Sequence, residues 1–311
     1  MQAVPVMVAP TLPLTWGAEA LWQQLAPLLQ GLSVEVLHST ASTNSALLER
    51  AHLLPENRRD GGDVLVRRSV ESGAFGRRAA DLQPCLLVAE HQTAGRGRQG
   101  RTWKSVTGAS LTFSLGLPLS LADWSGMSLA VGVALCDALD PPQARSTVPG
   151  APRLGLKWPN DLWLIDADGA GRKLGGILIE TVAAGAQRLA VIGIGLNVLP
   201  FAAADLNTGF ATLRELDAQA SAPAVLARVA LPLVQALKRF ERDGFAAFAQ
   251  AFAARDLLCG REVRTSHSDV PQGVARGVSA QGALLVEING RLVTVSSGEV
   301  SVRLDGPAAA A

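Results

Sequence analysis

The stretch Gly95-Arg96-Gly97-Arg98-Gln99-Gly100-Arg101-Thr102-Trp103 lies between two apolar runs, 85–89 and 110–115, whose composition is typical of β-strands. Glycine lets a backbone approach a ligand closely, arginine pairs with phosphate or carboxylate, and an indole offers a flat face to a ring. Solvated RNA-binding tails have a similar Arg/Gly composition. Because both flanks are predicted strands, we expect this stretch to form a loop that projects from a folded sheet. We expect the loop to close over a bound anion that also carries a base.

The middle of the chain contains further strand candidates in close succession, which favours antiparallel pairing and an α+β fold. They are 154–157, 162–165, 174–181 and 189–196. An edge strand is expected at 34–37. The expected helices are 16–29, about 42–54, 121–139, 222–242 and 244–258.

From Glu262 onward the pattern changes to short alternating runs separated by turn residues. Asn289-Gly290 between two such runs is a strong hairpin signal. The tail is therefore predicted to be a small β-barrel domain. Its strands are expected at 263–265, 273–278, 283–288, 291–295 and 300–304.

Composition excludes several classes of protein. The 311 residues are 48% hydrophobic, enough for a large core, and the net charge of +1 gives no electrostatic case for a nucleic-acid or membrane partner. The three cysteines lack metal-ligand spacing, which indicates reduced thiols in a cytoplasmic protein. The first 16 residues have no basic region and include three prolines, unlike a signal peptide.

Three further segments contain residues suited to chemistry. Lys157-Trp158-Pro159-Asn160-Asp161 is either a simple β-turn or a turn that presents a lysine and a carboxylate to the same pocket as the Arg/Gly loop. In the second case the carboxylate could hold Mg²⁺ bridged to phosphates. Lys173 precedes Gly175-Gly176, which would let a ligand lie against the strand. Asn197 follows two glycines and either caps a bulge or contacts a base edge.

Cationic residues gather around one carboxylate, Asp161, in these segments, and no Ser–His–Asp or Cys–His arrangement is apparent. This pattern suits phosphoryl or adenylyl transfer, in which charge stabilisation supplies most of the catalysis. The cations are Arg96, Arg98, Arg101, Lys157 and Lys173.

Taken together and in this order, the motifs resemble those of bacterial biotin–protein ligases, over roughly residues 34–304. The resemblance implies a class II aminoacyl-tRNA-synthetase-like catalytic domain followed by an SH3-like C-terminal domain. It also implies that ATP and Mg²⁺ support attachment of the substrate biotin to a lysine of the biotin carboxyl carrier domain of acetyl-CoA carboxylase, through biotinoyl-5′-AMP and without a tightly bound prosthetic group. The motifs are Ser42-Thr43-Asn44, 92–103, 157–161, 172–178 and Gly195-Leu196-Asn197.

The resemblance implies a role for each matching position. Residues that resemble the biotin contacts are Ser42, Thr43, Asn44, Gln92, Arg96, Gly97, Arg98 and Lys173. Those that resemble nucleotide contacts are Arg96, Arg98, Trp103 and Asn197, with Trp103 as the adenine-stacking aromatic. Lys173, Arg98 and Asp161 resemble catalytic residues, and Asp161 serves either Mg²⁺ or the incoming lysine.

The expected domains are a helical extension over 1–33, a catalytic domain over 34–260 and an SH3-like domain over 261–305. Two segments depart from the family pattern: an insertion at 55–84 and a lengthened turn at 166–171. The segment before Val34 has one charged residue, Glu19, and is too short for a winged helix-turn-helix. We therefore expect a monofunctional ligase that binds no specific DNA.

Two other functions remain as alternatives. A lipoate- or octanoate-handling ligase or transferase has a related fold, although the Arg/Gly loop argues against it. A biotin-sensing regulator without catalytic turnover would need a DNA-binding domain, which the sequence before Val34 does not indicate.

Overall fold

The computed structural model describes residues 14–52, 74–75, 82–142, 151–167, 169–184, 187–201, 210–296 and 302–304. The expected insertion at 55–84 lies almost entirely outside the described residues, as does most of the segment joining the third helix to the next strand. All statements below concern the described part of the chain.

An eight-stranded sheet forms the centre of the molecule, with the strand order β2-β1-β3-β6-β10-β9-β8-β7. β1 runs parallel to β3, and every other neighbouring pair is antiparallel. This confirms the antiparallel pairing and the α+β class expected from the closely spaced strands. The strands are β1 Ser33–Thr40, β2 Ala74–Phe75, β3 Cys85–Gln92, β6 Ser110–Leu119, β7 Arg153–Lys157, β8 Asp161–Ile165, β9 Gly171–Ala184 and β10 Gln187–Asn197.

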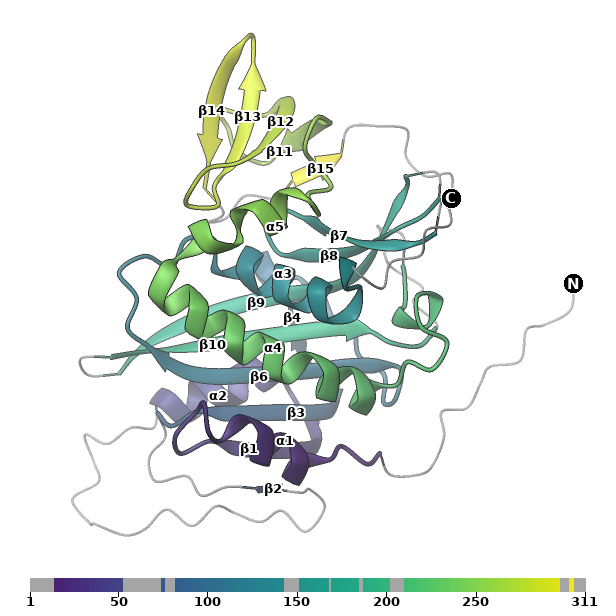
Figure 1. The fold of residues 1–311 in the computed structure, drawn as a ribbon, viewed down its shortest axis with the longest axis vertical. Coiled ribbons are helices and arrows are strands. Elements are labelled where there is room, and N and C mark those ends of the chain that lie inside the picture. The colour runs from purple at the N-terminus through teal and green to yellow at the C-terminus, as the bar shows by residue number, and fades with distance from the viewer. Residues whose placement is uncertain are drawn as a thin grey trace, which may run out of the picture.

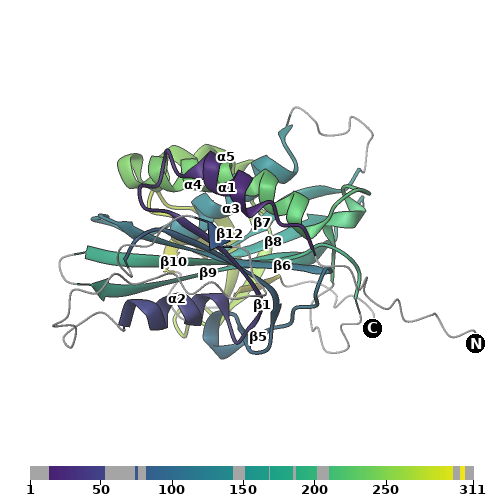
Figure 2. The same cartoon turned by 90° about the horizontal axis from the view of Figure 1, so that it is seen from below.

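Helices cover the two faces of this sheet unequally. Three of them, α1 (Ala18–Leu25), α3 (Met127–Leu139) and α4 (Ala222–Asp243), lie on one face, as Figure 1 shows. α2 (Thr43–His52) lies on the other face, which is visible when the molecule is turned in Figure 2. The face that carries α2 is therefore the more open of the two.

The core follows the period of two along each strand, since successive side chains point to opposite faces. On β10, Ile192 and Ile194 join the large core beneath α1, α3 and α4. Val191 points the other way and packs with Leu47 of α2 in a smaller core. The sheet is thus filled with apolar side chains on the three-helix face and only partly so on the α2 face.

A second, five-stranded antiparallel sheet forms the C-terminal domain, with the order β14-β13-β12-β11-β15, at the top of Figure 1. Asn289 (φ 50°) and Gly290 (φ 74°) make the tight turn between β13 and β14, as the Asn-Gly signal indicates. Buried residues of this domain, such as Val263 and Val286, are continuous with the large core. The strands are β11 Glu262–Thr265, β12 Gln272–Val278, β13 Leu284–Ile288, β14 Arg291–Val295 and β15 Val302–Leu304.

The structure corrects three local expectations. Residues 121–126 are not helical, because Gly126 has φ 76° and packs against Phe245, so α3 begins at Met127. The helix expected over 244–258 is a 3₁₀ turn, Phe245–Phe248, followed by the short α5, Ala249–Ala253. Beyond α5, backbone groups bond to Leu156 of β7 instead of continuing the helix.

The third correction concerns β1, which is not at the edge of the sheet because the two-residue β2 pairs with its outer side. Within the described ranges, no helix is both long and apolar enough to cross a membrane.

Candidate active site

Small and hydroxyl-bearing side chains line the α2 face of the sheet at its centre. They come from β6 and β10, whose other faces are fully apolar. Adjacent positions across the two strands pair Ser114 with Gly193 and Thr112 with Gly195. Because glycine and short hydroxyl residues fill little volume, this face can accept a ligand lying against the sheet.

Four buried polar side chains, which we call the neutral network, connect α2 to this floor: Thr43, Asn44, Gln92 and Ser114. The Gln92 Oε1 accepts hydrogen bonds from the Thr43 backbone N–H (2.8 Å) and hydroxyl (3.2 Å). The Ser114 hydroxyl donates to Asn44 Oδ1 (2.6 Å) and lies 2.6 Å from Thr43 Oγ1. All four residues are at most 8% exposed, and they bear no charge.

The neighbouring residues explain how the neutral network is held in place. Ser42 precedes α2 and its Oγ accepts the Ser45 N–H at 3.4 Å, as an N-cap does. The Ser105 hydroxyl lies within hydrogen-bond distance of both backbone groups of Gln92 (2.8 and 3.3 Å). A Cβ added to Gly193 would collide with the Asn44 amide, so glycine is needed there.

The Arg/Gly stretch forms a hairpin in which β4 (Gly95–Arg96) pairs with β5 (Thr102–Trp103). Gly97 does not use positive φ: its backbone is extended, and its N–H donates to Arg101 O at 2.7 Å. The left-handed positions are Gln99 (φ 56°) and Gly100 (φ 69°). The segment is thus a folded hairpin, and its movement without ligand stays a prediction.

Two side chains attach this hairpin to the sheet. Arg96 forms an ion pair with Glu180 of β9 at 2.7 Å. The Trp103 ring lies so close to Gly195 of β10 that any side chain there would collide with it. Trp103 Nε1 is buried and has no hydrogen-bond partner among the described residues. A flat aromatic surface and an unused donor therefore lie beside the floor of the site.

Charged residues gather on the Trp103 side of the floor, and we call three of them the charged cluster: Arg98, Asp161 and Lys173. Lys173 Nζ donates to Asp161 Oδ1 at 2.8 Å and lies 6.0 Å from the Trp103 ring centroid. Lys173 and Asp161 are partly exposed, with side-chain exposures of 28% and 18%. Gly176 lies opposite Asp161 in the sheet, and a Cβ added there would be in ordinary van der Waals contact with both side chains.

Arg98 reaches the charged cluster from the hairpin. Its Nη1 donates to Asn160 Oδ1 at 3.4 Å, and Asn160 Nδ2 is fixed in turn by the carbonyl of Ile177 (2.7 Å). Burial lowers the pKa of the Arg98 guanidinium, while Asp161 raises it and Arg101 lowers it. The cluster therefore combines two cations, Arg98 and Lys173, with one carboxylate, which suits the binding of a polyanion.

Lys157 occupies a different place from the one expected, since it is buried at 9% exposure and its Nζ donates to Val302 O of β15 at 2.8 Å. Burial is the main cause of a lowered Lys157 pKa, opposed by Asp161 and reinforced by Lys173. The next residue, Trp158, donates its Nε1–H to Gly282 O at 3.0 Å. Both bonds run from the turn that precedes Asp161 to the C-terminal domain.

Asn197, another of the predicted site residues, is the last residue of β10. Its Nδ2 lies 3.4 Å from Lys173 O, and it is 5% exposed.

The lengthened turn before Lys173 is held by Arg172, which bonds to both oxygens of Asp166 (2.7 and 2.9 Å) and to Glu215 (2.7 Å). The hydrogen bonds to Asp166 and Glu215 raise the pKa of Arg172. The hydrogen bond from Arg172 lowers the pKa of Asp166.

The described residues contain no group of three or more carboxylates, histidines or cysteines that could hold a metal by themselves. Asp161 stands alone as a carboxylate beside Lys173. Mg²⁺ commonly takes one or two protein carboxylates together with substrate phosphates and water. Asp161 is thus the carboxylate of this site that could ligate a magnesium ion arriving with a nucleotide.

Sequence reasoning missed three residues of the site: Ser105, Ser114 and Glu180. The signal for Ser114 was present, because Ser110, Thr112 and Ser114 alternate along a strand that is otherwise apolar. Glu180 follows the Gly-Gly segment by four residues, but nothing local indicates that it meets Arg96 from a different strand. The predicted residues themselves lie on one face of the sheet, brought together from six segments.

Known proteins are similar to this chain in sequence and in fold. Residues 80–197 match the Biotin/lipoate A/B protein ligase family, and residues 258–303 match the Biotin protein ligase C terminal domain. The biotin--[acetyl-CoA-carboxylase] ligase of Mycobacterium tuberculosis is 34% identical, over 91% of each chain. The bifunctional ligase/repressor BirA of Escherichia coli is 33% identical over 90% of this chain and 77% of its own. A solved biotin protein ligase from Aquifex aeolicus, in complex with biotin and ATP, has a TM-score of 0.65 at 24% identity, covers 88% of this chain and 99% of its own, and thus has the same fold.

Proposed function

This chain belongs to the biotin protein ligase family and ligates biotin, and on that premise we propose that it joins biotin to a lysine of a carboxylase's carrier domain through biotinoyl-5′-AMP. One observation carries the proposal: uncharged polar groups and cations lie next to each other over the same part of the sheet. Asn44 packs on Gly193, Trp103 packs on Gly195, and Lys173 lies 6.0 Å from Trp103. A ligand with a neutral head and an anionic tail would span the two.

The neutral network is suited to the ureido ring of biotin. A ureido group offers both N–H donors and a carbonyl acceptor without charge, and buried polar groups of that kind need matching neutral partners. Thr43 and Asn44 of α2 and Gln92 of β3 supply hydroxyl and amide groups next to the floor, and Ser42 caps α2. Arg96 and Gly97 would cover this end from the hairpin.

The charged cluster is suited to the first chemical step. The biotin carboxylate attacks the α-phosphorus of ATP, the bond to pyrophosphate breaks, and the mixed anhydride forms. Lys173 and Arg98 would offset the repulsion between two anions and stabilise charge on the phosphoryl oxygens in the transition state. Trp103 would stack on the adenine, with Asn197 near its edge. Magnesium, when bound through Asp161 and the nucleotide phosphates, would supply further neutralisation of charge.

The second step transfers the biotinoyl group. An uncharged lysine amine of the carrier attacks the acyl carbon, AMP leaves, and an amide bond is formed. Asp161 would accept the proton that this amine must lose, and the partial exposure of its carboxylate supports this role. The β4–β5 hairpin would protect the water-labile anhydride until the carrier arrives.

The direct test is incubation of the protein with biotin, MgATP and an isolated biotin-acceptor domain. We expect intact-mass spectrometry to find one biotinoyl group on the acceptor and none on an acceptor whose target lysine is arginine. Without acceptor, hydroxylamine should trap biotin hydroxamate, which reports the activated intermediate. Unmodified acceptor under these conditions would overturn the proposed function.

Two arms of the same experiment address the alternatives. Lipoate or octanoate in place of biotin should give no product, and equal modification by lipoate would favour the related ligases instead. A gel-shift assay with biotin and ATP should give no salt-resistant complex with a specific DNA sequence. Such a complex would establish a regulator that also binds DNA.

A further inference from the structure

Glu180 lies on β9 at the point where α2, the sheet and the β4–β5 hairpin meet. Its carboxylate accepts Asn44 Nδ2 at 2.9 Å and both terminal nitrogens of Arg96, at 2.7 and 3.3 Å. One side chain thus connects a member of the neutral network to the first strand of the hairpin. No other role for Glu180 follows from the mechanism above.

The contacts of Asn44 show that its amide has a fixed orientation. Its oxygen accepts the Ser114 hydroxyl at 2.6 Å, and its nitrogen donates to both Leu178 O (3.1 Å) and Glu180 (2.9 Å). Both amide protons and one acceptor site are therefore used. Without the Glu180 carboxylate, one N–H of the Asn44 amide would lose its acceptor, and the amide could rotate.

The contacts of Arg96 show that the same carboxylate holds the hairpin. The Arg96 side chain is 45% exposed and extends over α2, where its Nη1 also lies 3.3 Å from Ser45 Oγ. The bidentate geometry with Glu180 fixes the direction of the guanidinium, which a single contact would not. Because Arg96 belongs to β4, this ion pair ties the hairpin to the central sheet.

We propose that Glu180 is a positioning residue that couples the biotin end of the site to closure of the β4–β5 hairpin, and so retains the activated intermediate. The retention of an activated intermediate rests on the proposed function. The contacts of Glu180 with Asn44 and Arg96 do not depend on it. Loss of the carboxylate would loosen the hairpin and disorient Asn44 at the same time. A residue that only stabilised the fold would not link these two effects.

Glu180→Gln is the sharpest variant, because it keeps the size of the side chain and removes the charge. Glu287→Gln is a matched control, since Glu287 of β13 also pairs with an arginine at 2.7 Å but lies in the C-terminal domain. The first measurement needs no activity: trypsin cleavage within residues 95–103, followed by mass spectrometry in the absence of ligands. We expect cleavage in Glu180→Gln to be roughly three- to tenfold faster, as loss of a partly exposed ion pair and a hydrogen bond allows, and unchanged in Glu287→Gln.

The second measurement compares two amounts of attached biotin. One is the biotin on a bystander protein that has no acceptor domain, the other is the biotin on the acceptor domain, and the first divided by the second gives a labelling ratio. Glu180→Gln should raise this ratio and the KM for biotin together, and Glu180→Asp should restore part of both. Salt should raise the ratio for the original protein, because it screens the partly exposed pair, and should have little effect on Glu180→Gln. Equal trypsin cleavage and an unchanged ratio in a folded Glu180→Gln protein would overturn the coupling. A failure of the proposed function would appear differently, as no biotinylation by the original protein.

Discussion

The neutral network and the charged cluster lie on the same face of one sheet but are held in opposite ways. The neutral network is buried and bonded within the catalytic sheet and α2. The charged cluster is partly exposed, and the turn that leads to Asp161 is bonded to the C-terminal domain through Lys157 and Trp158. Under the proposed function, recognition of the uncharged group would therefore depend on one domain, whereas binding of the anions would depend on two.

The physical reason lies in desolvation. A neutral hydrogen-bonding group can be buried at modest cost when its partners are fixed, so the neutral network can be sealed by nearby elements. Buried cations cost far more, so the charged cluster keeps contact with solvent and with a carboxylate. The substitutions below separate the two regions, from the largest expected effect to the smallest.

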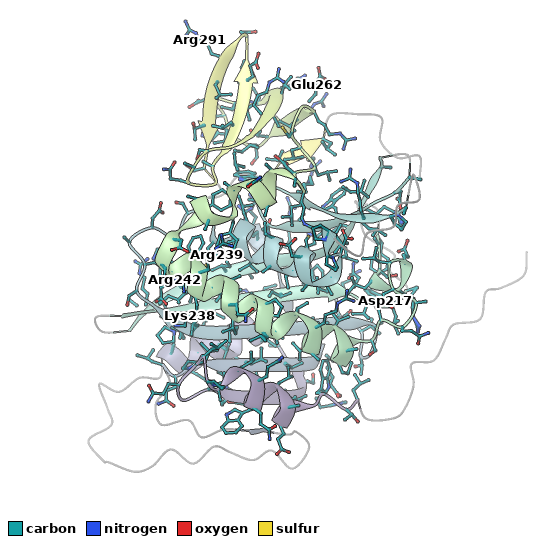
Figure 3. All side chains as sticks on the ribbon, in the orientation of Figure 1. Asp217, Lys238, Arg239, Arg242, Glu262 and Arg291 are labelled. Carbon is teal, nitrogen blue, oxygen red and sulfur yellow. The ribbon has the colours of Figure 1, made fainter. Side chains whose placement is uncertain are left out.

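Lys173→Ala should have the largest effect, on the charged cluster alone. Loss of one stabilising charge at a developing anion should reduce biotin-dependent pyrophosphate exchange at least ~10²-fold. The KM for biotin should change little, because the neutral network is intact. Lys238→Ala on the outer surface of α4, labelled in Figure 3, is the control and should behave as the original protein. Near-normal exchange in Lys173→Ala would remove this lysine from the mechanism.

Ser114→Ala should affect the neutral network and leave the charged cluster unchanged. Asn44 Oδ1 would lose the donor at 2.6 Å, so the free energy of unfolding should fall by about 1–3 kcal/mol. The affinity for biotin, measured by calorimetry, should fall with it, while the KM for ATP should stay the same. An equal loss for both substrates would mean that the two regions are not separate.

Trp158→Phe tests whether the C-terminal domain positions the charged cluster. It removes the hydrogen bond to Gly282 O and keeps an aromatic ring, so the unfolding free energy should fall by only about 1 kcal/mol. The kcat for ligation should fall severalfold without a change in biotin affinity. Trp163→Phe is the matched control, because Trp163 Nε1 is buried without a partner among the described residues. Equal kcat values in the two variants would contradict the positioning role.

Asp256→Asn should have the smallest effect, on stability at the junction of the two domains. Burial raises the pKa of Asp256 in the folded protein, and its Oδ2 has no hydrogen-bond partner within the described chain. The folded state therefore binds this proton more tightly than the unfolded state, so unfolding free energy falls as pH rises through the folded pKa. Asparagine removes this penalty, and the variant should gain on the order of 1 kcal/mol at pH 7.

Urea unfolding of both proteins at pH 7 and at a pH below the pKa of an unfolded aspartate checks this sign. The difference between them should shrink at the lower pH, where Asp256 is protonated in both states. A variant that is relatively more stable at low pH than at neutral pH would show that the carboxylate stabilises the junction instead.

Much of the architecture followed from local pattern. Alternating apolar residues and close spacing predicted the strands of both sheets, since side-chain direction alternates along a strand whatever its neighbours are. Asn289-Gly290 predicted its hairpin because few other pairs accept positive φ at both positions. The glycines that precede Asn197, Gly193 and Gly195, are the positions of β10 on which Asn44 and Trp103 pack.

The sequence by itself thus determined the elements, the α+β class and the residue types available for binding a polyanion. Only the tertiary structure decided which residues face one another: that Lys157 turns to β15, that Ser114 orients Asn44, and that Glu180 joins Asn44 to Arg96. These contacts join residues far apart in the chain, and strand order and register, which no local pattern encodes, bring them together. A side chain's neighbours along the chain set its local conformation, whereas its neighbours in space set its charge environment and its partners.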